Sequence, residues 1–257
     1  MRLPADDPLR AARRDGKVTL GAFIAMPCSI GAEILAAAGF DWLCIDAQHG
    51  MIDAAQTVTI LQAIGARPVT ALVRVPANDP AAIGWALDAG AAGVIVPSIE
   101  NRDDARRAIA ATRYPPAGIR SVGPTRARIR FGPDYVDRAD DLAQCIVMIE
   151  SVRAMGELEA IVAEPGIAAV FVGPADLALS IDGLACRPGD PRVRAYVARA
   201  ARVCAANGIP CGVFAEGADG AADYASLGVR MLAVGLDTEY LRTAAARALE
   251  IARCATE

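Results

Sequence analysis

The sequence predicts an α/β fold in which eight parallel strands and their helices close into a (β/α)8 TIM barrel. The chain has 257 residues, a length that is normal for one such barrel. Short β-rich segments alternate with helical segments along the whole chain. The β-rich segments are nearly continuous apolar runs, the pattern of parallel strands that are covered on both faces. We therefore expect a single barrel domain over residues 1–257.

The expected elements follow one another in strand–helix order. The predicted strands lie near residues 19–26, 41–46, 69–75, 92–96, 145–149, 168–172, 210–215 and 229–235. The predicted helices lie near residues 30–39, 53–66, 79–89, 101–112, 153–163, 192–206, 217–227 and 237–254. Eight such units in one chain of this length favour closure into a barrel.

Residues typical of helix ends stand at the predicted boundaries. Asp53 precedes a helical segment as an N-cap, and Asp79 is followed by Pro80, which suits the first position of a helix. Glycines stand where helices should end, at Gly39, Gly65, Gly90 and Gly228. One segment does not fit the pattern. Residues 113–143 are too long for an ordinary helix-to-strand connection, and a loop of this length is expected to be a lid or a binding loop.

Composition excludes several classes of protein. The net charge of −4 argues against a nucleic-acid-binding surface, which normally carries a basic excess. The seven cysteines include Cys44, Cys145 and Cys211 within predicted strands, so we expect buried, reduced thiols and a reducing compartment. Residues 1–17 lack the apolar core of a secretory signal, and no window approaches 18 uncharged apolar residues. We expect a cytoplasmic protein without a membrane segment.

Charged residues follow several of the predicted strands. Asp46 ends the second strand, and His49, the one histidine of the chain, comes three residues later. Arg74 ends the third strand, Glu150 follows the fifth, and Asp176 lies just beyond the sixth. The carboxyl ends of barrel strands form one face, where the active sites of such barrels lie. We expect these five side chains to converge on that face.

Each of these residues also has an ordinary structural interpretation. A lone loop histidine is often structural, and Glu150 and Asp176 could be N-caps or salt-bridge partners of Arg74. Two carboxylates on neighbouring strand ends also suit Mg²⁺ or Mn²⁺, whereas the absence of CxxC and HxxxH spacings argues against a closed zinc site. A cation, an arginine fork and His49 together could form and hold an enolate of a 2-oxo acid.

Two further features concern the substrate. The turn Gly173-Pro174-Ala175-Asp176 opens toward a helical segment and could offer backbone N–H groups to a carboxylate. Lys17 is the one lysine of the chain, and it precedes the first predicted strand. An aldolase that forms a Schiff base needs a lysine inside the barrel. If the chain is an aldolase, it must therefore use a metal ion.

The segments that carry these residues together resemble the HpcH/HpaI aldolase family, the class II pyruvate aldolases of the phosphoenolpyruvate/pyruvate superfamily. The resemblance runs in order from about residue 20 to residue 240, with family-like spacing. The matching segments are Phe40-Asp41-Trp42 through His49-Gly50 and residues 72–76, 87–97, 113–120, 149–150 and 172–177.

The resemblance implies an enzyme similar to 4-hydroxy-2-oxoheptanedioate aldolase. Such an enzyme reversibly cleaves a 4-hydroxy-2-oxo acid to pyruvate and an aldehyde through a metal-stabilised pyruvate enolate. The family's metal ligands match Glu150 and Asp176, with Mg²⁺, Mn²⁺ or Co²⁺ as the cofactor. Its substrate arginine matches Arg74, and its proton-transfer histidine matches His49.

Two aspartates are assigned by the resemblance alone. Asp46 matches a family aspartate near the metal. Asp88 matches an aspartate that acts with the histidine, often from a neighbouring subunit. The resemblance also implies a homohexamer in which the C-terminal helix, 237–254, packs on a neighbour.

Some positions depart from the family pattern or leave alternatives open. Gln48 stands where many relatives carry glutamate, and Ser121 replaces a common glycine. The arginines of 113–143 form either a solvated or intersubunit face or a receptor for the distal carboxylate of a dicarboxylic substrate: Arg113, Arg120, Arg126, Arg128 and Arg130. The alternative functions are a lyase of malyl- or citramalyl-CoA type and a non-catalytic barrel that binds a 2-oxo acid.

Overall fold

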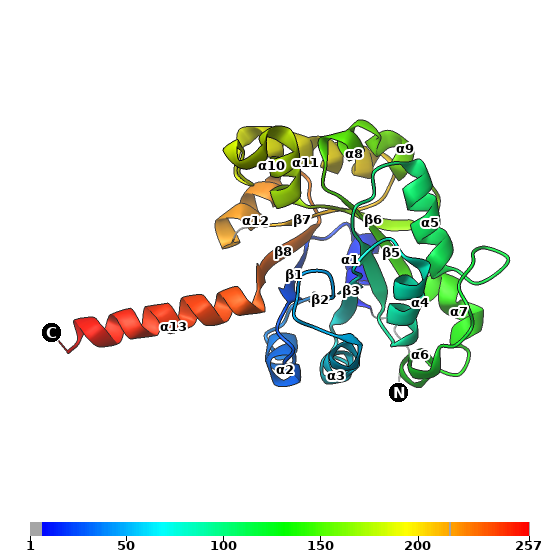
Figure 1. Cartoon of the computed structure of the whole chain (residues 1–257), viewed down its shortest axis with the longest axis horizontal. Helices are drawn as coiled ribbons and strands as arrows, with labels where there is room; N and C mark the ends of the chain where they lie inside the picture. The colour runs from blue at the N-terminus through cyan, green and yellow to red at the C-terminus, as the bar shows by residue number, and fades with distance from the viewer. Residues whose placement is uncertain (1–6, 216, 257) are drawn as a thin grey trace.

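The structure, a computed structural model, describes residues 7–215 and 217–256. Within these residues, eight strands form a closed barrel in which each strand is parallel to its neighbours and β8 pairs with β1 (Figure 1). The strands are β1 (Thr19–Ile24), β2 (Trp42–Asp46), β3 (Thr70–Arg74), β4 (Gly93–Val96), β5 (Gln144–Ile149), β6 (Ile167–Val172), β7 (Cys211–Phe214) and β8 (Met231–Leu236). Each overlaps one predicted strand, so the predicted (β/α)8 fold is confirmed.

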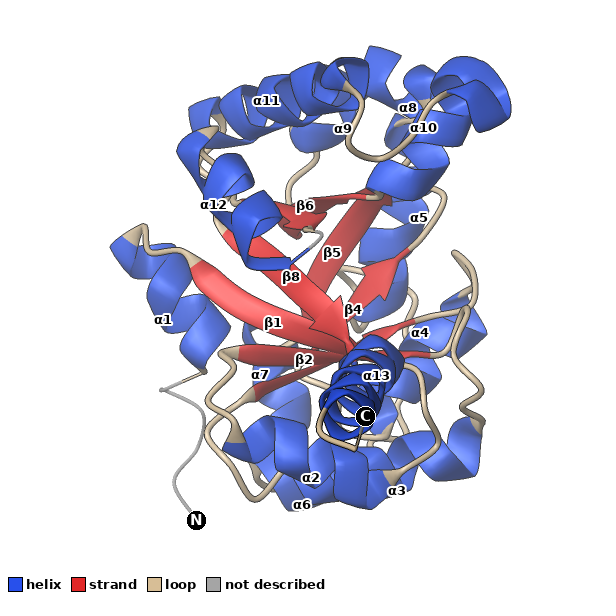
Figure 2. Ribbon diagram, turned by 90° about the vertical axis from the view of Figure 1, so that its left-hand side faces the viewer, coloured by secondary structure: helices blue, strands red, loops and turns tan. Residues whose placement is uncertain are grey.

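The predicted helices are also confirmed, with one difference, and they surround the strands (Figure 2). Seven of them correspond to single helices: α2 (Ser29–Ala37), α3 (Ala54–Ile64), α4 (Pro80–Asp88), α5 (Arg102–Thr112), α11 (Pro191–Ala206), α12 (Gly217–Ser226) and α13 (Asp237–Cys254). The predicted helix 153–163 is divided into α8 (Val152–Gly156) and α9 (Leu158–Val162).

The two N-terminal helix caps predicted from the sequence are present in the structure. The Asp53 side chain accepts a hydrogen bond from the Gln56 backbone N–H at 2.8 Å, and the Gln56 side chain accepts one from the Asp53 N–H at 2.8 Å. This reciprocal capping box satisfies two backbone donors that the helix leaves free. The Asp79 carboxylate accepts from the first turn of α4, with Pro80 as its first residue.

The barrel has one apolar layer inside and a second between the strands and the helices. In β2, Trp42 and Cys44 belong to the interior cluster with Phe23 and Phe171, whereas Leu43 and Ile45 pack outward under the helices. Every residue of β2 is buried. This burial on both faces is why the strands are nearly continuous apolar runs in the sequence.

A helix that the sequence did not predict, α1 (Pro8–Asp15), covers the amino ends of the strands. Leu9 of α1 belongs to the interior cluster, and its N–H donates to the Thr70 hydroxyl at 3.2 Å. That hydroxyl donates in turn to the Asp7 carboxylate at 2.8 Å. The amino end of the barrel is therefore plugged, while the carboxyl end is left for other residues to line.

Segment 113–143 is not an open loop and does not form a lid over the carboxyl ends of the strands of its own chain. It contains α6 (Thr125–Phe131) and α7 (Tyr135–Leu142), which share a small buried cluster. The segment joins α5 to β5, so it lies at the amino ends of the strands. Arg126 donates to the carbonyl of Ala89, just past the end of α4, at 2.5 Å. Length alone could not distinguish two short packed helices from a loop.

The C-terminal helix α13 extends away from the barrel (Figure 1). Its first residue, Asp237, is buried and accepts hydrogen bonds from the N–H groups of Ala25 and Met26 at 3.0 and 2.9 Å. Beyond this anchor the helix carries exposed apolar side chains, including Leu241 and Ile251. No helix among the described residues is both long and apolar enough to cross a membrane.

Close packing in the barrel interior yields a stability prediction. Gly21 is the cross-strand partner of Trp42, and a Cβ atom at position 21 would overlap the indole ring. We expect Gly21→Ala to lower the free energy of unfolding by about 1–3 kcal/mol, because the buried ring must shift. Urea denaturation would measure the loss. Gly156→Ala is the matched control, since a Cβ there meets nothing within 4 Å; equal stability of both variants would contradict the prediction.

Candidate active site

A buried ion pair between Asp46 and Arg74 lies at the carboxyl ends of β2 and β3. The two residues are partners in the strand register, so their side chains emerge next to each other. Arg74 Nε donates to Asp46 Oδ1 at 2.9 Å, and Nη2 donates to Oδ2 at 2.6 Å. The side chains are only 12% and 4% exposed. Such a two-point contact fixes the plane of the guanidinium.

Asp46 also holds the turn that carries His49. Its Oδ1 accepts the backbone N–H groups of Gln48 and His49, both at 3.1 Å, in an Asx-type turn. Gly50 closes the turn by donating its N–H to the Asp46 carbonyl at 3.1 Å. A Cβ at Gly50 would collide with that carbonyl, so the turn requires glycine here. One carboxylate therefore sets the positions of both Arg74 and His49.

The environment keeps Arg74 charged and leaves one of its edges free. Burial alone would lower the pKa of Arg74, but the hydrogen bonds and negative charge of Asp46 outweigh burial and raise the pKa. The guanidinium carbon lies 5.1 Å from the centre of the Phe23 ring. Among residues 7–215 and 217–256, Nη1 has only the weakly accepting Met148 sulfur as a partner, at 4.0 Å. This N–H group remains available for an oxyanion.

Glu150 directly follows β5, and Asp176 lies in the first turn of the helix that follows β6. Glu150 Oε1 accepts from the backbone N–H of Ser98 at 2.7 Å and from its hydroxyl at 3.2 Å. Ser98 has φ 57°, an uncommon conformation for a residue other than glycine. Burial raises the pKa of Glu150, and the neighbouring charge of Asp176 raises it further, although the Ser98 hydrogen bonds oppose the shift.

The backbone at Gly173 lies close to the side chain of Glu150. A Cβ at Gly173 would lie 3.0 Å from Glu150 Oε2. Gly173 is the N-cap of α10 (Pro174–Asp182), whose first turn contains Ala175 and Asp176. The amide groups at a helix N-terminus favour an anion. The glycine therefore brings Glu150 against the start of a helix that can receive a carboxylate.

A cavity of about 350 Å³ joins most of these groups. It brings Asp46, His49, Arg74 and Asp176 together, as predicted, and includes the whole Gly173–Asp176 turn. Glu150 does not line the cavity itself but lies against Gly173 at its edge. The remaining lining residues are all apolar: Phe23, Ala25, Met148, Phe171, Pro188, Phe214 and Leu236.

The donor set at this edge fits a hard divalent cation with an open coordination sphere. Glu150 and Asp176 supply carboxylate oxygens, and their mutual repulsion would be relieved by a cation between them. Across residues 7–215 and 217–256 there is no cluster of three or more His, Cys, Asp or Glu with metal-binding geometry. Water or substrate oxygens would have to complete the coordination, as is usual for Mg²⁺.

Asp88 lies at the opposite end of the barrel from His49. It is the last residue of α4 and precedes β4, so it belongs to the amino-terminal face, whereas His49 follows β2. Its carboxylate is paired with Arg120, at 2.5 Å from Nη2. The other arginines of 113–143 are on the same face. Within one chain, none of them lies near the cavity, so a role for them in binding a distal carboxylate stays a prediction.

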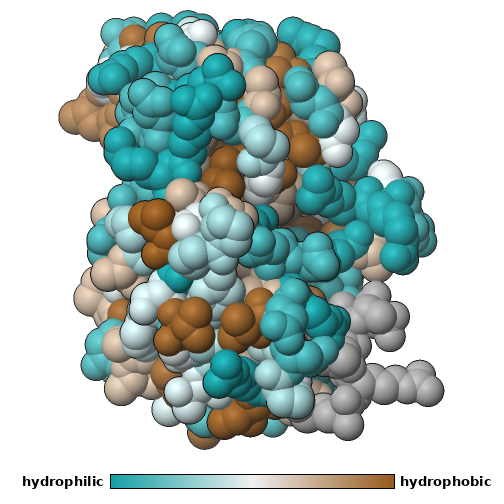
Figure 3. Space-filling model, turned by 90° about the vertical axis from the view of Figure 1, so that its right-hand side faces the viewer, coloured by the Kyte–Doolittle hydropathy of each residue, from teal (hydrophilic) through white to brown (hydrophobic). Residues whose placement is uncertain are grey.

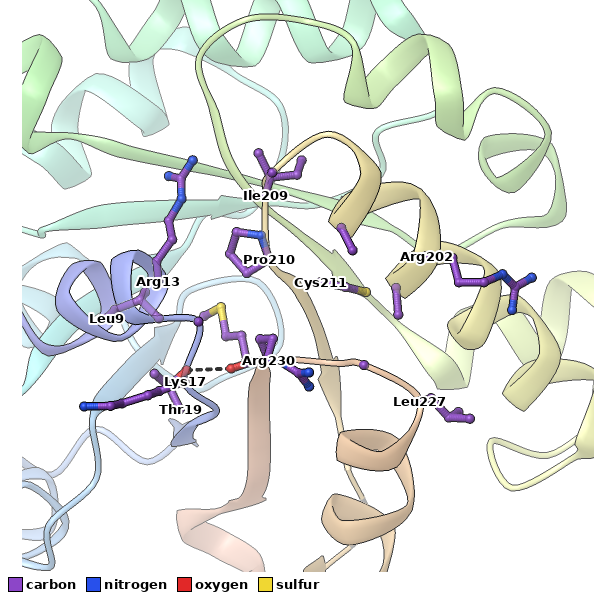
Figure 4. A pocket seen from close by; sticks show the side chains of 16 residues that line it. Leu9, Arg13, Lys17, Thr19, Arg202, Ile209, Pro210, Cys211, Leu227 and Arg230 are labelled. Carbon is purple, nitrogen blue, oxygen red and sulfur yellow. Dashed lines mark hydrogen bonds between the residues drawn. The ribbon is translucent and has the colours of Figure 1, made fainter.

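A second cavity of about 350 Å³ lies at the amino ends of β1, β7 and β8 (Figure 4). Its lining includes four basic residues, Arg13, Lys17, Arg202 and Arg230. In its lining, the Thr19 hydroxyl donates to the Arg230 carbonyl at 3.1 Å. Size does not distinguish the two cavities, but the second one contains no carboxylate or histidine among its lining residues. We assign the chemistry to the carboxyl-end cavity.

Sequence reasoning missed two contacts of the site. It considered Glu150 or Asp176 as the partner of Arg74, but the partner is Asp46. The strand register pairs positions 46 and 74, and only this register identifies Asp46 as the partner. It also missed Ser98, for which the sequence gives no signal, because its backbone N–H and unusual φ are set by tertiary structure.

Comparisons with known proteins place the chain among aldolases. The family model HpcH/HpaI aldolase/citrate lyase matches residues 20–244. The chain is 40% identical over 243 residues to the 4-hydroxy-2-oxo-heptane-1,7-dioate aldolase of Escherichia coli ATCC 8739, covering 93% of this chain and 92% of the relative.

Two solved structures have a similar fold. One is a HpcH/HpaI aldolase/citrate lyase family protein from Burkholderia cenocepacia J2315, with TM-score 0.89 and 37% identity, covering 96% of this chain and 99% of the other. The second is the citrate synthase SbnG, with TM-score 0.86 and 25% identity, covering 96% and 98%. On this evidence, the chain belongs to the HpcH/HpaI aldolase/citrate lyase family.

Proposed function

We propose that the chain is a divalent-metal-dependent class II aldolase that reversibly cleaves a 4-hydroxy-2-oxo acid to pyruvate and an aldehyde. The aldolase class predicted from the sequence is confirmed by the relatives. The single observation that carries the site assignment is the Arg74 fork, fixed by Asp46 in the same cavity as His49 and Asp176. The first substrate to test is 4-hydroxy-2-oxo-heptane-1,7-dioate, which the Escherichia coli relative is named for.

The substrate would be held at its 2-oxo acid end. Its carboxylate would accept N–H groups from the first turn of α10, at Ala175 and Asp176, where Gly173 leaves room. Its 2-oxo oxygen would face Nη1 of Arg74. The apolar walls of the cavity would exclude water around the reacting carbons and strengthen these contacts.

In the cleavage direction, His49 would accept the proton of the C4 hydroxyl as the C3–C4 bond breaks. The electron pair moves to the pyruvate half, where Arg74 stabilises the negative charge on oxygen. A proton then returns to the methylene carbon and gives pyruvate. Glu150 and Asp176 would hold Mg²⁺, Mn²⁺ or Co²⁺, which when bound supplies Lewis-acid polarisation of the 2-oxo group.

The assembled protein would be a homo-oligomer, by family resemblance a hexamer. Two observations support an assembly. α13 carries exposed Leu241, Leu249 and Ile251 away from its own barrel, where a neighbouring subunit could cover them. Asp88 is too far from His49 of its own chain to act with it, so their cooperation requires a neighbour. The free, mostly buried cysteines are consistent with the cytoplasmic location that we propose.

The alternatives are less well supported. A lyase for CoA thioesters would need a surface for the CoA phosphates, and a non-catalytic barrel would not need the competent residues that fill the site. The curated relatives at about 40% identity carry aldolase names over nearly the whole chain. We therefore keep the pyruvate aldolase as the proposed function.

Replacing Arg74 tests the part of the site that would bind the 2-oxo oxygen of the substrate. We expect Arg74→Lys to lose about 10²- to 10³-fold in activity, because lysine keeps the charge but cannot both bridge Asp46 and present an N–H to the oxyanion. The assay is metal-dependent exchange of pyruvate methyl protons in D₂O, followed by NMR. Arg199→Lys is the control, since Arg199 pairs with Glu159 on the outer helices. An active Arg74→Lys enzyme would refute the proposed role.

Removing one carboxylate tests the metal site. We expect Glu150→Gln and Asp176→Asn to weaken Mn²⁺ binding by at least about tenfold and to abolish most turnover, because each removes a charged oxygen ligand. Mn²⁺ binding is measured by electron paramagnetic resonance without substrate, which separates binding from catalysis. Glu159→Gln is the control, because Glu159 lies on α9 away from the cavity. Unchanged Mn²⁺ affinity in both site variants would show that the metal ion binds elsewhere.

Replacing His49 separates the two halves of the reaction. We expect His49→Ala to slow aldol cleavage by about 10²- to 10⁴-fold, because proton transfer at the C4 hydroxyl is lost. Pyruvate methyl exchange should remain within a few-fold of the parent rate, since it does not involve that hydroxyl. Parallel measurement of both rates checks this. Equal losses in cleavage and exchange would show that His49 acts on pyruvate itself.

A further inference from the structure

Arg120 is a buried charge whose surroundings are unusually specific. Its side chain is 0% exposed, although it lies on the amino-terminal face far from the cavity. A buried guanidinium is costly unless it is paired. Asp88 is its one ion-pair partner among the described residues, at 2.5 Å from Nη2. Its Nε lacks a hydrogen-bond partner within the same part of the chain.

Two tyrosines fix the plane of this guanidinium. The guanidinium carbon lies 4.7 Å from the centre of the Tyr114 ring and 5.4 Å from that of Tyr135. Nη1 also hydrogen-bonds the Tyr135 hydroxyl oxygen at 3.0 Å. Burial raises the pKa of Tyr114 to about 12, so its ring stays neutral beside the cation. Stacking and the hydrogen bond together leave Arg120 little rotational freedom.

In this arrangement, one carboxylate oxygen of Asp88 is hydrogen-bonded within the described part of the chain and the other is not. Oδ1 accepts from Arg120, whereas Oδ2 has no hydrogen-bond partner among residues 7–215 and 217–256. The Asp88 side chain is 26% exposed, so it is reachable from outside. A Cβ at the neighbouring Gly123 would lie 3.5 Å from Oδ2. The free oxygen is therefore bordered by a residue without a side chain.

Exposed apolar side chains lie close in the sequence to Asp88 and Arg120. Trp85, one helical turn before Asp88, is 41% exposed, and Ile119 and Val122, on either side of Arg120 in the sequence, are 62% and 59% exposed. Figure 3 views the side of the molecule where α5, α6 and α7 lie, and hydrophobic side chains interrupt its hydrophilic surface. Exposed apolar side chains on a folded chain are typical of a surface that another protein covers.

We propose that Arg120 is a positioning residue that holds the Asp88 carboxylate in a fixed orientation for the His49 of a second copy of this chain. This inference rests on the proposed function, in which Asp88 acts with a neighbour's histidine. Tyr114 and Tyr135 fix the guanidinium, the guanidinium fixes Oδ1, and Oδ2 is then offered outward to accept the neighbouring imidazole N–H. Segment 113–143 thus serves the active site of a neighbouring chain from the far end of its own barrel.

A role in folding alone accounts poorly for the same contacts. A buried ion pair often stabilises a protein no more than well-packed apolar residues would, because both charges must be desolvated. A substrate-binding role for Arg120 is also disfavoured, because its side chain is fully buried and Nη2 is already engaged. The positioning role instead explains why one carboxylate oxygen is held and the other left open.

The test compares aldol cleavage with pyruvate methyl exchange in the assembled, metal-loaded enzyme. We expect Arg120→Gln to slow cleavage by about 10- to 100-fold, because the carboxylate loses its fixed orientation. Exchange should stay within about twofold of the parent rate, since it does not use the His49–Asp88 pair. The loss should fall on kcat and be equal for 4-hydroxy-2-oxoheptanedioate and 4-hydroxy-2-oxopentanoate. The double variant with Asp88→Asn should be no slower than Asp88→Asn alone.

Two further variants keep the test decisive if Arg120→Gln folds poorly. Tyr135→Phe keeps the ring and removes the hydroxyl that contacts Arg120, so it should reproduce the same pattern with a smaller loss. Arg138→Gln is the matched control from the same segment, because Arg138 pairs with Asp134 and not with the Asp88 carboxylate. We expect its cleavage rate to match the parent. Thermal melting and oligomer mass would be recorded for each variant.

The outcomes separate this inference from the proposed function. An active Asp88→Asn enzyme would overturn the role of Asp88 and this inference with it. An inactive Asp88→Asn enzyme beside fully active Arg120→Gln and Tyr135→Phe enzymes would overturn only the inference. A loss confined to the dicarboxylic substrate would make Arg120 a substrate receptor, and equal loss of cleavage and exchange would make its role structural. Each of these last two results would overturn the inference that Arg120 positions Asp88.

Discussion

The ion pair between Asp46 and Arg74 is the contact on which the rest of the site depends. It exists because parallel pairing of β2 and β3 places the two residues side by side where both strands end. The same carboxylate holds the turn that carries His49. Because Asp46 is buried and its acceptor positions are engaged, it cannot rotate without releasing both partners. In the proposed mechanism, the guanidinium of Arg74 and the turn that carries His49 therefore keep a fixed relation to each other.

The two ends of the barrel have different tasks. The carboxyl end is open, apolar-walled and lined by ionisable groups, whereas the amino end is plugged by α1 and Leu9. Asp88 and its supporting Arg120 are nevertheless at the amino end. Under our proposal, the site becomes complete only when another copy brings that end to the cavity. The projecting α13, with its exposed apolar side chains, gives a second physical reason for assembly.

Local patterns made much of the fold predictable. Strand residues such as those of β2 are apolar on both faces because one face fills the barrel and the other meets the helices. The caps at Asp53 and Asp79 follow from backbone donors that every helix leaves free at its start. Helices α6 and α7 were not predicted, because they are short and are stabilised by packing against each other more than by their own sequence.

The barrel, the family and the residues at the carboxyl ends of the strands could be predicted from the amino-acid sequence. This was possible because strand order and strand direction place such residues on one face whatever the details of packing. Tertiary structure alone decided the partners: Asp46 for Arg74, Ser98 for Glu150 and Asp88 for Arg120. Partners depend on register, backbone conformation and burial between distant segments. No local pattern encodes those quantities.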